Sequence, residues 1–163
     1  MSHKVPSKKE RTVVSEIMKD MKERHEIIFE DFVKTLSEEL GLFTGIANFS
    51  GNPKIEGFGL ERVFSEPEFD DHGLTVEFSR LIDNLEGVAR NLLEESSDAR
   101  PEIFIGKESS PEYVKEFSAV AIKFLDEDLG ESVIFSLGPK RMNYEKTYSV
   151  YSLINNEIKE VIE

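Results

Sequence analysis

Residues 132–161 combine the hydrophobic period of a strand with that of a helix, and a Gly-Pro pair stands between them. In residues 132–137 apolar and small side chains alternate, which predicts a strand with one apolar and one mixed face. Gly138 and Pro139 then predict a sharp turn that ends the strand, because proline cannot donate to a ladder. Beyond this turn, large apolar residues recur every three or four positions, as on one helix face: Tyr144, Tyr148, Tyr151, Ile154, Ile158 and Val161.

The charge balance argues against one broad class of function. The chain of 163 residues has 33 acidic and 20 basic residues, which gives a formal net charge of -13. Such a surface repels phosphate backbones, so we expect no direct nucleic-acid binding by this chain alone. Only the start is basic, where Lys4, Lys8, Lys9 and Arg11 predict a short solvated tail.

Cysteine is absent, which excludes disulfides, thiolate metal sites and a cysteine nucleophile. No apolar run approaches the roughly 18 residues that span a bilayer, and the first residues lack the apolar core of a signal peptide. We therefore expect a soluble, cytoplasmic protein with no membrane contact.

Residues 9–40 predict one long amphipathic helix, because they contain neither proline nor glycine and Gly41 follows as a stop signal. The helix would be roughly 45 Å long, which is more than a small domain needs. Its apolar residues first follow heptad spacing, so we assign residues 1–40 to a basic tail and a dimerising helix, and expect a homodimer. The heptad stripe consists of Val14, Met18, Met21, His25, Ile28 and Phe32.

Residues 41–163 predict one α+β domain. Helical periods occupy residues 59–64 and 71–95, with Gly87 as a weak point in the longer one. Strand patterns occupy residues 42–49, 102–105, 117–125 and 132–137, and the last two are close enough to form a hairpin. Residues 54–59 fit either a short strand or an extended link. These elements predict an antiparallel sheet flanked by helices, the architecture of GAF-type sensor domains, and the pattern alone also fits other α+β folds.

An acidic stretch offers five potential metal ligands: Glu66, Glu68, Asp70, Asp71 and His72. The side chains of neighbouring residues usually diverge, so we expect no metal site. Asp70 or Asp71 is better explained as the N-cap of the following helix, where an acid also suits the helix dipole. Catalytic motifs and phosphate-binding glycine spacings are absent from the sequence, so we expect neither an enzyme nor a cofactor.

Arg141 is interpreted as a structural residue that ties the strand end to the last helix through hydrogen bonds and a carboxylate contact. Contact with a partner or a ligand is the alternative. Gly138 and Pro139 are interpreted as turn formers, and Met142 as a residue that fills the core.

Three segments, in family order, resemble the heat-inducible transcription repressor family HrcA. They are Gly-Leu-x-x-Val followed by Pro-Glu-Phe within residues 59–69, Ile-Gly-x-Glu at 105–108, and Gly-Pro-x-Arg-Met-x-Tyr at 138–144. The residues that carry the resemblance are Gly59, Leu60, Pro67, Glu68, Phe69, Ile105, Gly106, Gly138, Pro139, Arg141, Met142 and Tyr144. The resemblance implies the C-terminal GAF-like regulatory domain of the family, without its winged-helix and inserted dimerisation domains.

The resemblance further implies a non-enzymatic regulatory and dimerisation module, linked to negative regulation of chaperone genes in the heat-shock response. In the family the partner is the GroEL-type chaperonin, and DNA contacts would come from a separate winged-helix or full-length repressor chain. Two alternatives stay open. One is a GAF-like small-molecule sensor with a cavity lined by residues such as Phe117, Ala119 and Phe135. The other is a structural dimer subunit that modulates a full-length repressor.

Overall fold

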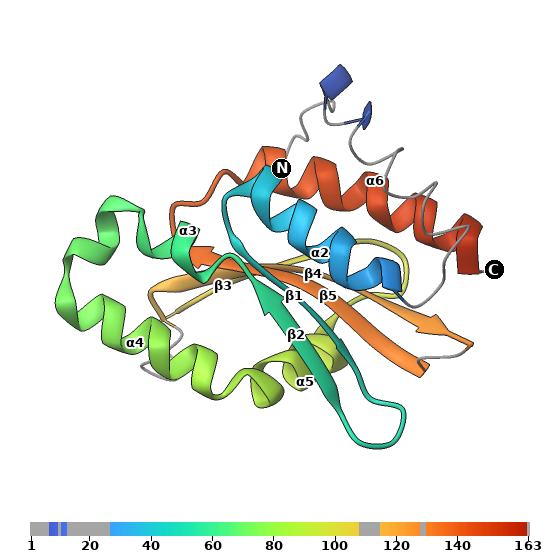
Figure 1. The fold of residues 1–163 in the computed structure, drawn as a ribbon, viewed down its shortest axis with the longest axis horizontal. Coiled ribbons are helices and arrows are strands. Elements are labelled where there is room, and N and C mark those ends of the chain that lie inside the picture. Colours follow the sequence, from blue (N-terminus) through green and yellow to red (C-terminus); the bar gives the residue numbers. More distant parts are fainter. Residues whose placement is uncertain (1–6, 10, 13–26, 108–114, 128–129, 163) are drawn as a thin grey trace.

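A computed structural model describes residues 7–9, 11–12, 27–107, 115–127 and 130–162. Its centre is a five-stranded sheet in the order β2-β1-β5-β4-β3, in which every neighbouring pair is antiparallel (Figure 1). The strands are β1 (Phe43–Asn48), β2 (Lys54–Phe58), β3 (Glu102–Ile105), β4 (Phe117–Asp126) and β5 (Gly130–Pro139). The four predicted strands and the hairpin between β4 and β5 are confirmed, and the open segment at 54–59 forms the strand β2 rather than an extended link.

Helices cover both faces of the sheet, which gives three layers. They are α2 (Ile27–Leu40), α3 (Leu60–Phe64), α4 (His72–Asp83), α5 (Leu85–Glu95) and α6 (Tyr144–Ile162), together with the 3-10 helix η1 (Pro67–Asp70). Helices α2 and α6 pack on one face, whereas α4 and α5 pack on the other (Figure 1). The predicted α+β architecture with flanking helices is confirmed.

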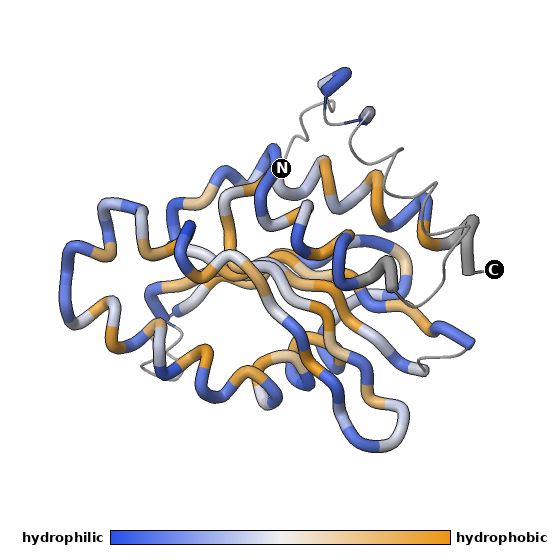
Figure 2. Tube along the Cα trace, in the orientation of Figure 1, coloured by the Kyte–Doolittle hydropathy of each residue, from blue (hydrophilic) through white to orange (hydrophobic). Residues whose placement is uncertain are grey.

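The central strand β5 is buried on both faces because each face has its own helical layer. Ile134 packs in the cluster with α2 and α6, whereas Val133, Phe135 and Leu137 pack in the cluster with α4 and α5. Figure 2 shows hydrophobic residues along the strands between these layers. The mixed face predicted for this strand is therefore not a solvated one.

The polar groups on that buried face satisfy one another. Ser136 Oγ lies 2.8 Å from Thr44 Oγ1 on β1 and 2.7 Å from the hydroxyl of Tyr151 on α6. All three residues are buried. Burial raises the pKa of the Tyr151 hydroxyl, since the charged form would lose its hydration. The chain of hydroxyl groups therefore links two strands and the last helix without leaving a buried polar group unpaired.

The prediction that Gly138 and Pro139 end the last strand is wrong, because β5 continues through both residues. Pro139 lies opposite Phe117, whose carbonyl accepts a hydrogen bond from Gly106 on the other side of β4. The pair of Pro139 and Phe117 is therefore a non-hydrogen-bonded pair of the ladder. Pro139 lacks an N–H on the side that faces β1, but β1 begins with Phe43 opposite Leu137 and does not reach Pro139, so the ladder tolerates the proline.

The predicted helix over residues 71–95 is two helices, and they divide at Asn84 rather than at Gly87. Asn84 leaves the helical backbone region with φ of -105° and ψ of 30°, and its carbonyl accepts the hydrogen bond of Val88 that opens α5. Asparagine is a weak helix former because its side chain competes for nearby backbone groups. The apolar stripe continues across this division onto the sheet.

The described chain includes the predicted N-terminal helix at its start, where residues 8–9 and 11–12 are helical, and at its end, as α2. Residues 13–26, and with them Val14, Met18, Met21 and His25, lie outside the described residues, and the side chain of Ile28 is likewise not described. Phe32 is 1% exposed and packs with Tyr151 and Ile154 in the core of its own chain. It is therefore not available to a dimer interface, which corrects the end of the predicted stripe. The physical reason is the drift of the stripe, which turns Phe32, Val33 and Leu36 towards the sheet.

Candidate functional site

The segments that carry the family resemblance meet at one end of the sheet. Gly138 and Pro139 at the end of β5 pair with Ser118 and Phe117 at the start of β4. On the other side of β4, the N–H of Gly106 donates to Phe117 O at 2.9 Å. We call this region the motif junction, formed by Gly59, Leu60, Pro67, Glu68, Phe69, Ile105, Gly106, Phe117, Gly138, Pro139, Arg141, Met142 and Tyr144.

Four phenylalanines form the interior of the motif junction. Phe69 lies parallel to Phe117 at 6.2 Å between ring centroids and meets Phe78 edge-on at 5.3 Å. Phe64 meets both Phe69 and Phe78 edge-on, at 5.4 and 5.7 Å. Pro67 begins the 3-10 helix that carries Phe69 into this cluster. Aromatic pairs of this geometry stabilise beyond simple burial, so the cluster fixes η1 against the sheet.

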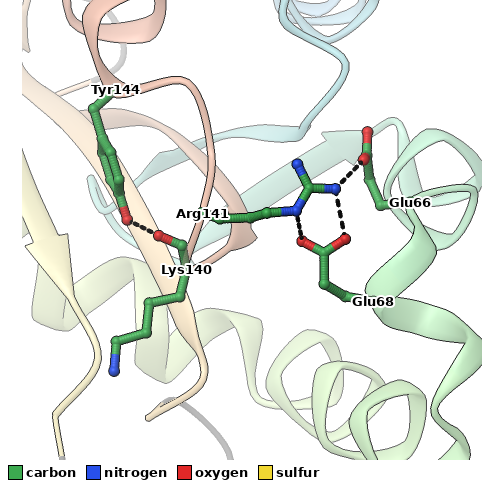
Figure 3. A network of polar contacts seen from close by, with 5 residues as sticks. All are labelled: Glu66, Glu68, Lys140, Arg141 and Tyr144. Atoms are coloured by element: carbon green, nitrogen blue, oxygen red, sulfur yellow. Dashed lines mark hydrogen bonds and ion pairs between the residues drawn. The ribbon is translucent and has the colours of Figure 1, made fainter.

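Arg141 holds the same 3-10 helix from outside. Its Nε lies 2.6 Å from Glu68 Oε2, and its Nη2 lies 2.7 Å from Glu68 Oε1 and 3.2 Å from Glu66 Oε2 (Figure 3). The two carboxylates raise the pKa of Arg141, with the hydrogen bond to Glu68 as the largest cause. The interpretation of Arg141 as a structural residue with a carboxylate partner is supported. The partner, however, is η1 and not the last helix.

The turn between β5 and α6 is closed by Tyr144 and Met142. The hydroxyl of Tyr144 donates to Lys140 O (Figure 3), and it lies 2.7 Å from Ser118 Oγ, which must then be the donor. Met142 is buried, as predicted, and its N–H donates to Pro139 O at 3.0 Å. The turn that follows β5 therefore starts one residue after the proline and is anchored to β4.

Gly59 connects β2 to α3 in a backbone conformation that few other residues adopt, with φ of 96°. The buried Ser37 on α2 lies between two carbonyl oxygens that can accept its single hydroxyl proton, with Oγ 2.7 Å from Leu42 O and 3.0 Å from Phe58 O. A Cβ atom at position 59 would lie 1.9 Å from Ser37 Oγ and 2.7 Å from Leu42 O. Glycine is therefore required here by both conformation and space. The sequence pattern did not indicate Ser37, since a serine in a helix carries no such signal.

Two large hydrophobic residues of the resemblance are exposed at the surface. Leu60 is 36% exposed at the start of α3, and Ile105 is 46% exposed at the end of β3. Neither side chain packs in the aromatic cluster. Their exposure makes them accessible to another molecule.

The acidic stretch caps a helix and binds Arg141. Asp71 Oδ1 accepts a hydrogen bond from the N–H of Leu74 at 3.2 Å, which confirms the predicted N-cap. Glu66 and Glu68 are instead the partners of Arg141. Among the described residues, no group of three or more histidine, aspartate or glutamate side chains is placed to hold a metal ion.

A cleft of about 700 Å³ lies beside the motif junction, between α5 and the strands β3 and β4. Phe117 and Ala119, which we predicted as lining residues of a sensor cavity, do line this cleft. Phe135 does not, because it is fully buried deeper in the same cluster. Arg90, Asn91, Glu94, Glu95 and Lys107 are exposed residues along the cleft, so it is an open groove rather than an enclosed cavity.

The geometry agrees with a comparison against protein families. The model of the family described as the HrcA protein C-terminal domain matches residues 3–148, which include every segment of the motif junction. The chain belongs to the HrcA family. The HrcA resemblance drawn from three short segments is therefore confirmed over nearly the whole chain.

Curated HrcA proteins match the same region. A heat-inducible transcription repressor HrcA from Clostridium tetani is 28% identical over 135 residues, which are 82% of this chain and 38% of that protein. The HrcA repressor of Clostridium botulinum strain Alaska E43 is 27% identical over 121 residues, which are 74% of this chain and 34% of that protein. The chain thus spans little more than a third of the length of these curated relatives.

Solved structures support the GAF-like architecture predicted for this HrcA-family domain. The GAF domain of A. aeolicus nlh2, in an inactive state, superimposes with a TM-score of 0.54 at 16% identity and 94% coverage of both chains. This similarity concerns the fold alone. Within the described residues, no helix combines the length and apolar character that crossing a membrane requires.

Reversing the charge of Arg141 tests whether its ion pairs hold the segment 138–144 against the segment 59–69. We expect Arg141→Glu to lower Tm, because it places a third carboxylate beside Glu66 and Glu68, and Glu68→Arg in the same chain to restore part of the loss. About 1 M salt should reduce both effects, since Arg141 is 62% exposed. As a matched control, Arg62→Glu should change Tm less, because its ion pair with Glu38 is 3.8 Å long. Equal effects of the two reversals, or no recovery in the double variant, would show that the contact does not hold η1.

Proposed function

We propose that this chain is a non-enzymatic regulatory module of the heat-inducible repressor family, which acts in the cytoplasm to control transcription of heat-shock genes. The observation that carries the proposal is the motif junction. Four separate regions of the chain bring the residues shared with the repressor family to one end of the sheet. Their contacts are structural, and they include no arrangement of a nucleophile, a base and an oxyanion donor.

The mechanism we propose is a shift between two arrangements of the module. The aromatic cluster holds η1 from inside, while the ion pair of the exposed Arg141 with the half-buried Glu68 holds it from outside. A partner that binds more tightly when η1 is docked would stabilise that arrangement by the difference between its two affinities. The partner that the family relationship favours is a GroEL-type chaperonin, which would report the load of unfolded protein.

We propose that operator contacts come from a winged helix on another chain or on a longer form of this one. The net charge of -13 supports this, because a surface of that sign repels DNA. In a fluorescence anisotropy titration with operator DNA at about 0.15 M salt, the chain alone should show no tight, sequence-specific binding. Specific binding that survives competition by unrelated DNA would contradict this assignment.

Dimerisation is proposed to use the heptad residues that precede α2. Val14, Met18, Met21 and His25 retain the spacing that favours helix pairing, whereas Phe32 belongs to the core. Analytical ultracentrifugation of the whole chain should show a dimer, and Met18→Glu together with Met21→Glu should convert it to a monomer without loss of helical signal. A dimer that is unchanged in this variant would place the interface elsewhere. A mixed dimer with a full-length repressor, detected by co-expression, would be the form in which this chain modulates DNA binding.

A further inference from the structure

The two edges of the sheet differ in a way that bears on binding. The β2 edge exposes the charged side chains of Lys54 and Glu56, which is how natural sheets discourage strand addition. The β3 edge instead carries the apolar run Ile103, Phe104 and Ile105, and in the described chain no strand pairs with its outer side. β3 is therefore the edge that can accept another strand.

The backbone groups of β3 that face outward can be identified from its pairing with β4. The N–H of Gly106 bonds to Phe117 O, so Gly106 and, two residues before it, Phe104 turn their backbone groups towards β4. Ile103 and Ile105 alternate with them, so their N–H and C=O groups point away from the sheet. Ile103 packs its side chain with the cluster on the opposite face, and what it presents to the cleft is its backbone.

Helix α5 forms the other wall of the cleft. Its lining residues include Gly87, Val88, Asn91 and Glu94, which follow the spacing of one helix face. Val88 and Leu92 supply an apolar floor together with Phe104 and Phe117. A helix beside a free strand edge, with an apolar floor between them, is the arrangement in which domains bind extended peptides by strand addition.

The two ends of the cleft differ in charge. Asp98, which follows α5, lies with its Oδ1 3.4 Å from Nζ of Lys123 on β4. Lys123 is two residues from Ala121, which pairs with Glu102 at the start of β3. The C-terminal end of α5 therefore lies near the start of β3, where Glu94 and Glu95 are exposed. Arg100, 3.9 Å from Glu102, offsets part of the charge there. Arg90 packs over the ring of Phe49 at 4.5 Å, just after β1, which β5 and β4 separate from β3. Lys107 follows the opposite end of β3. The start of β3 is thus the acidic end of the cleft.

We propose that this cleft binds an extended polypeptide segment of a partner protein, which adds to β3 as a sixth, antiparallel strand. Its alternate apolar side chains would enter the space between β3 and α5, and its backbone would bond to the outward groups of Ile103 and Ile105. Because the added strand is antiparallel, its C-terminal side lies at the acidic end. The segment therefore carries lysine or arginine after its apolar residues. The proposal holds whether or not the chain regulates transcription.

The test uses a labelled probe peptide, Val-Thr-Val-Thr-Val-Lys-Lys, titrated with the whole chain and followed by fluorescence anisotropy. We expect saturable binding, and loss of binding when alternate amides of the peptide are N-methylated, since methylation removes the donors of the ladder. Ile105→Pro removes the outward N–H of β3 and should abolish binding, whereas Ile105→Ala keeps this N–H and should retain it. The backbone N–H and C=O of Ile105 make no hydrogen bond to β4, so the proline should leave the pairing of β3 with β4 intact. Circular dichroism of both variants shows whether they are folded.

The charge of the segment is tested separately on α5. Glu94→Lys should raise the Kd of the probe peptide at least about fivefold, because it places a cation beside the lysines of the peptide. Glu86→Lys makes the same charge change on an exposed residue of α5 outside the cleft and should leave affinity unchanged. Absence of binding, equal binding of the N-methylated peptide, equal effects of the two lysine variants, or occupation of the β3 edge by a second copy of this chain would each overturn the proposal.

Discussion

Replacing Gly59 with alanine should lower the free energy of unfolding by about 3 kcal/mol or more, since strained backbone and forced overlap each contribute roughly 1–3 kcal/mol. The new Cβ would stand 1.9 Å from Ser37 Oγ and 2.7 Å from the carbonyl oxygen of Leu42. The second contact is with backbone, so a side-chain rotation cannot relieve it. Denaturant unfolding followed by circular dichroism would measure the loss.

Gly51 offers a matched control for this substitution. It also has a positive φ, 87°, but a Cβ there would meet nothing within 4 Å. Gly51→Ala should therefore cost only about 1–2 kcal/mol, which is the conformational part of the effect. If the two variants lost equal stability, the packing of Ser37 against the start of α3 would not be the reason for glycine at position 59.

Replacing Phe69 with alanine should also be costly, at about 3–4 kcal/mol, the range for removal of a buried aromatic ring. Phe69 is 8% exposed and contacts three other rings, those of Phe64, Phe78 and Phe117. Its loss leaves a cavity between η1 and the sheet. Thermal and denaturant unfolding of the variant would give the change in stability.

Phe69→Leu is the matched variant, because leucine keeps most of the volume and loses the ring contacts. We expect it to cost about 1 kcal/mol, close to other hydrophobic exchanges of similar size. A Phe69→Ala variant as stable as the wild type would mean that η1 is not docked on Phe117 in solution. The motif junction would then have no aromatic interior.

Much of the fold could be predicted from the sequence because its signals are local. The alternation of residues 132–137 and the period of three to four from Tyr144 are imposed by burial on a strand and a helix, and both elements are found. Asp71 as an N-cap follows from the same kind of local rule. Signals of this sort need no knowledge of the rest of the chain.

Other features depend on what lies across the structure. Pro139 remains in β5 because of where β1 begins, and no local pattern contains that information. The partner of Arg141 is Glu68, more than seventy positions away, and an arginine in a turn does not indicate which carboxylate it will meet. The role of Ser37 likewise depends on Gly59, which a separate element brings beside it. Long-range contacts of this kind decide the candidate site, so the sequence predicted its residues but not its geometry.

The regulatory role is tested most directly by the affinity of a full-length family repressor for its operator, measured by anisotropy as this chain is titrated. We predict that the folded chain shifts this affinity several-fold, that a GroEL-type chaperonin changes the shift, and that the Phe69→Ala variant produces neither effect. An operator affinity that stays the same at every concentration of the folded chain, with and without the chaperonin, would contradict the regulatory role.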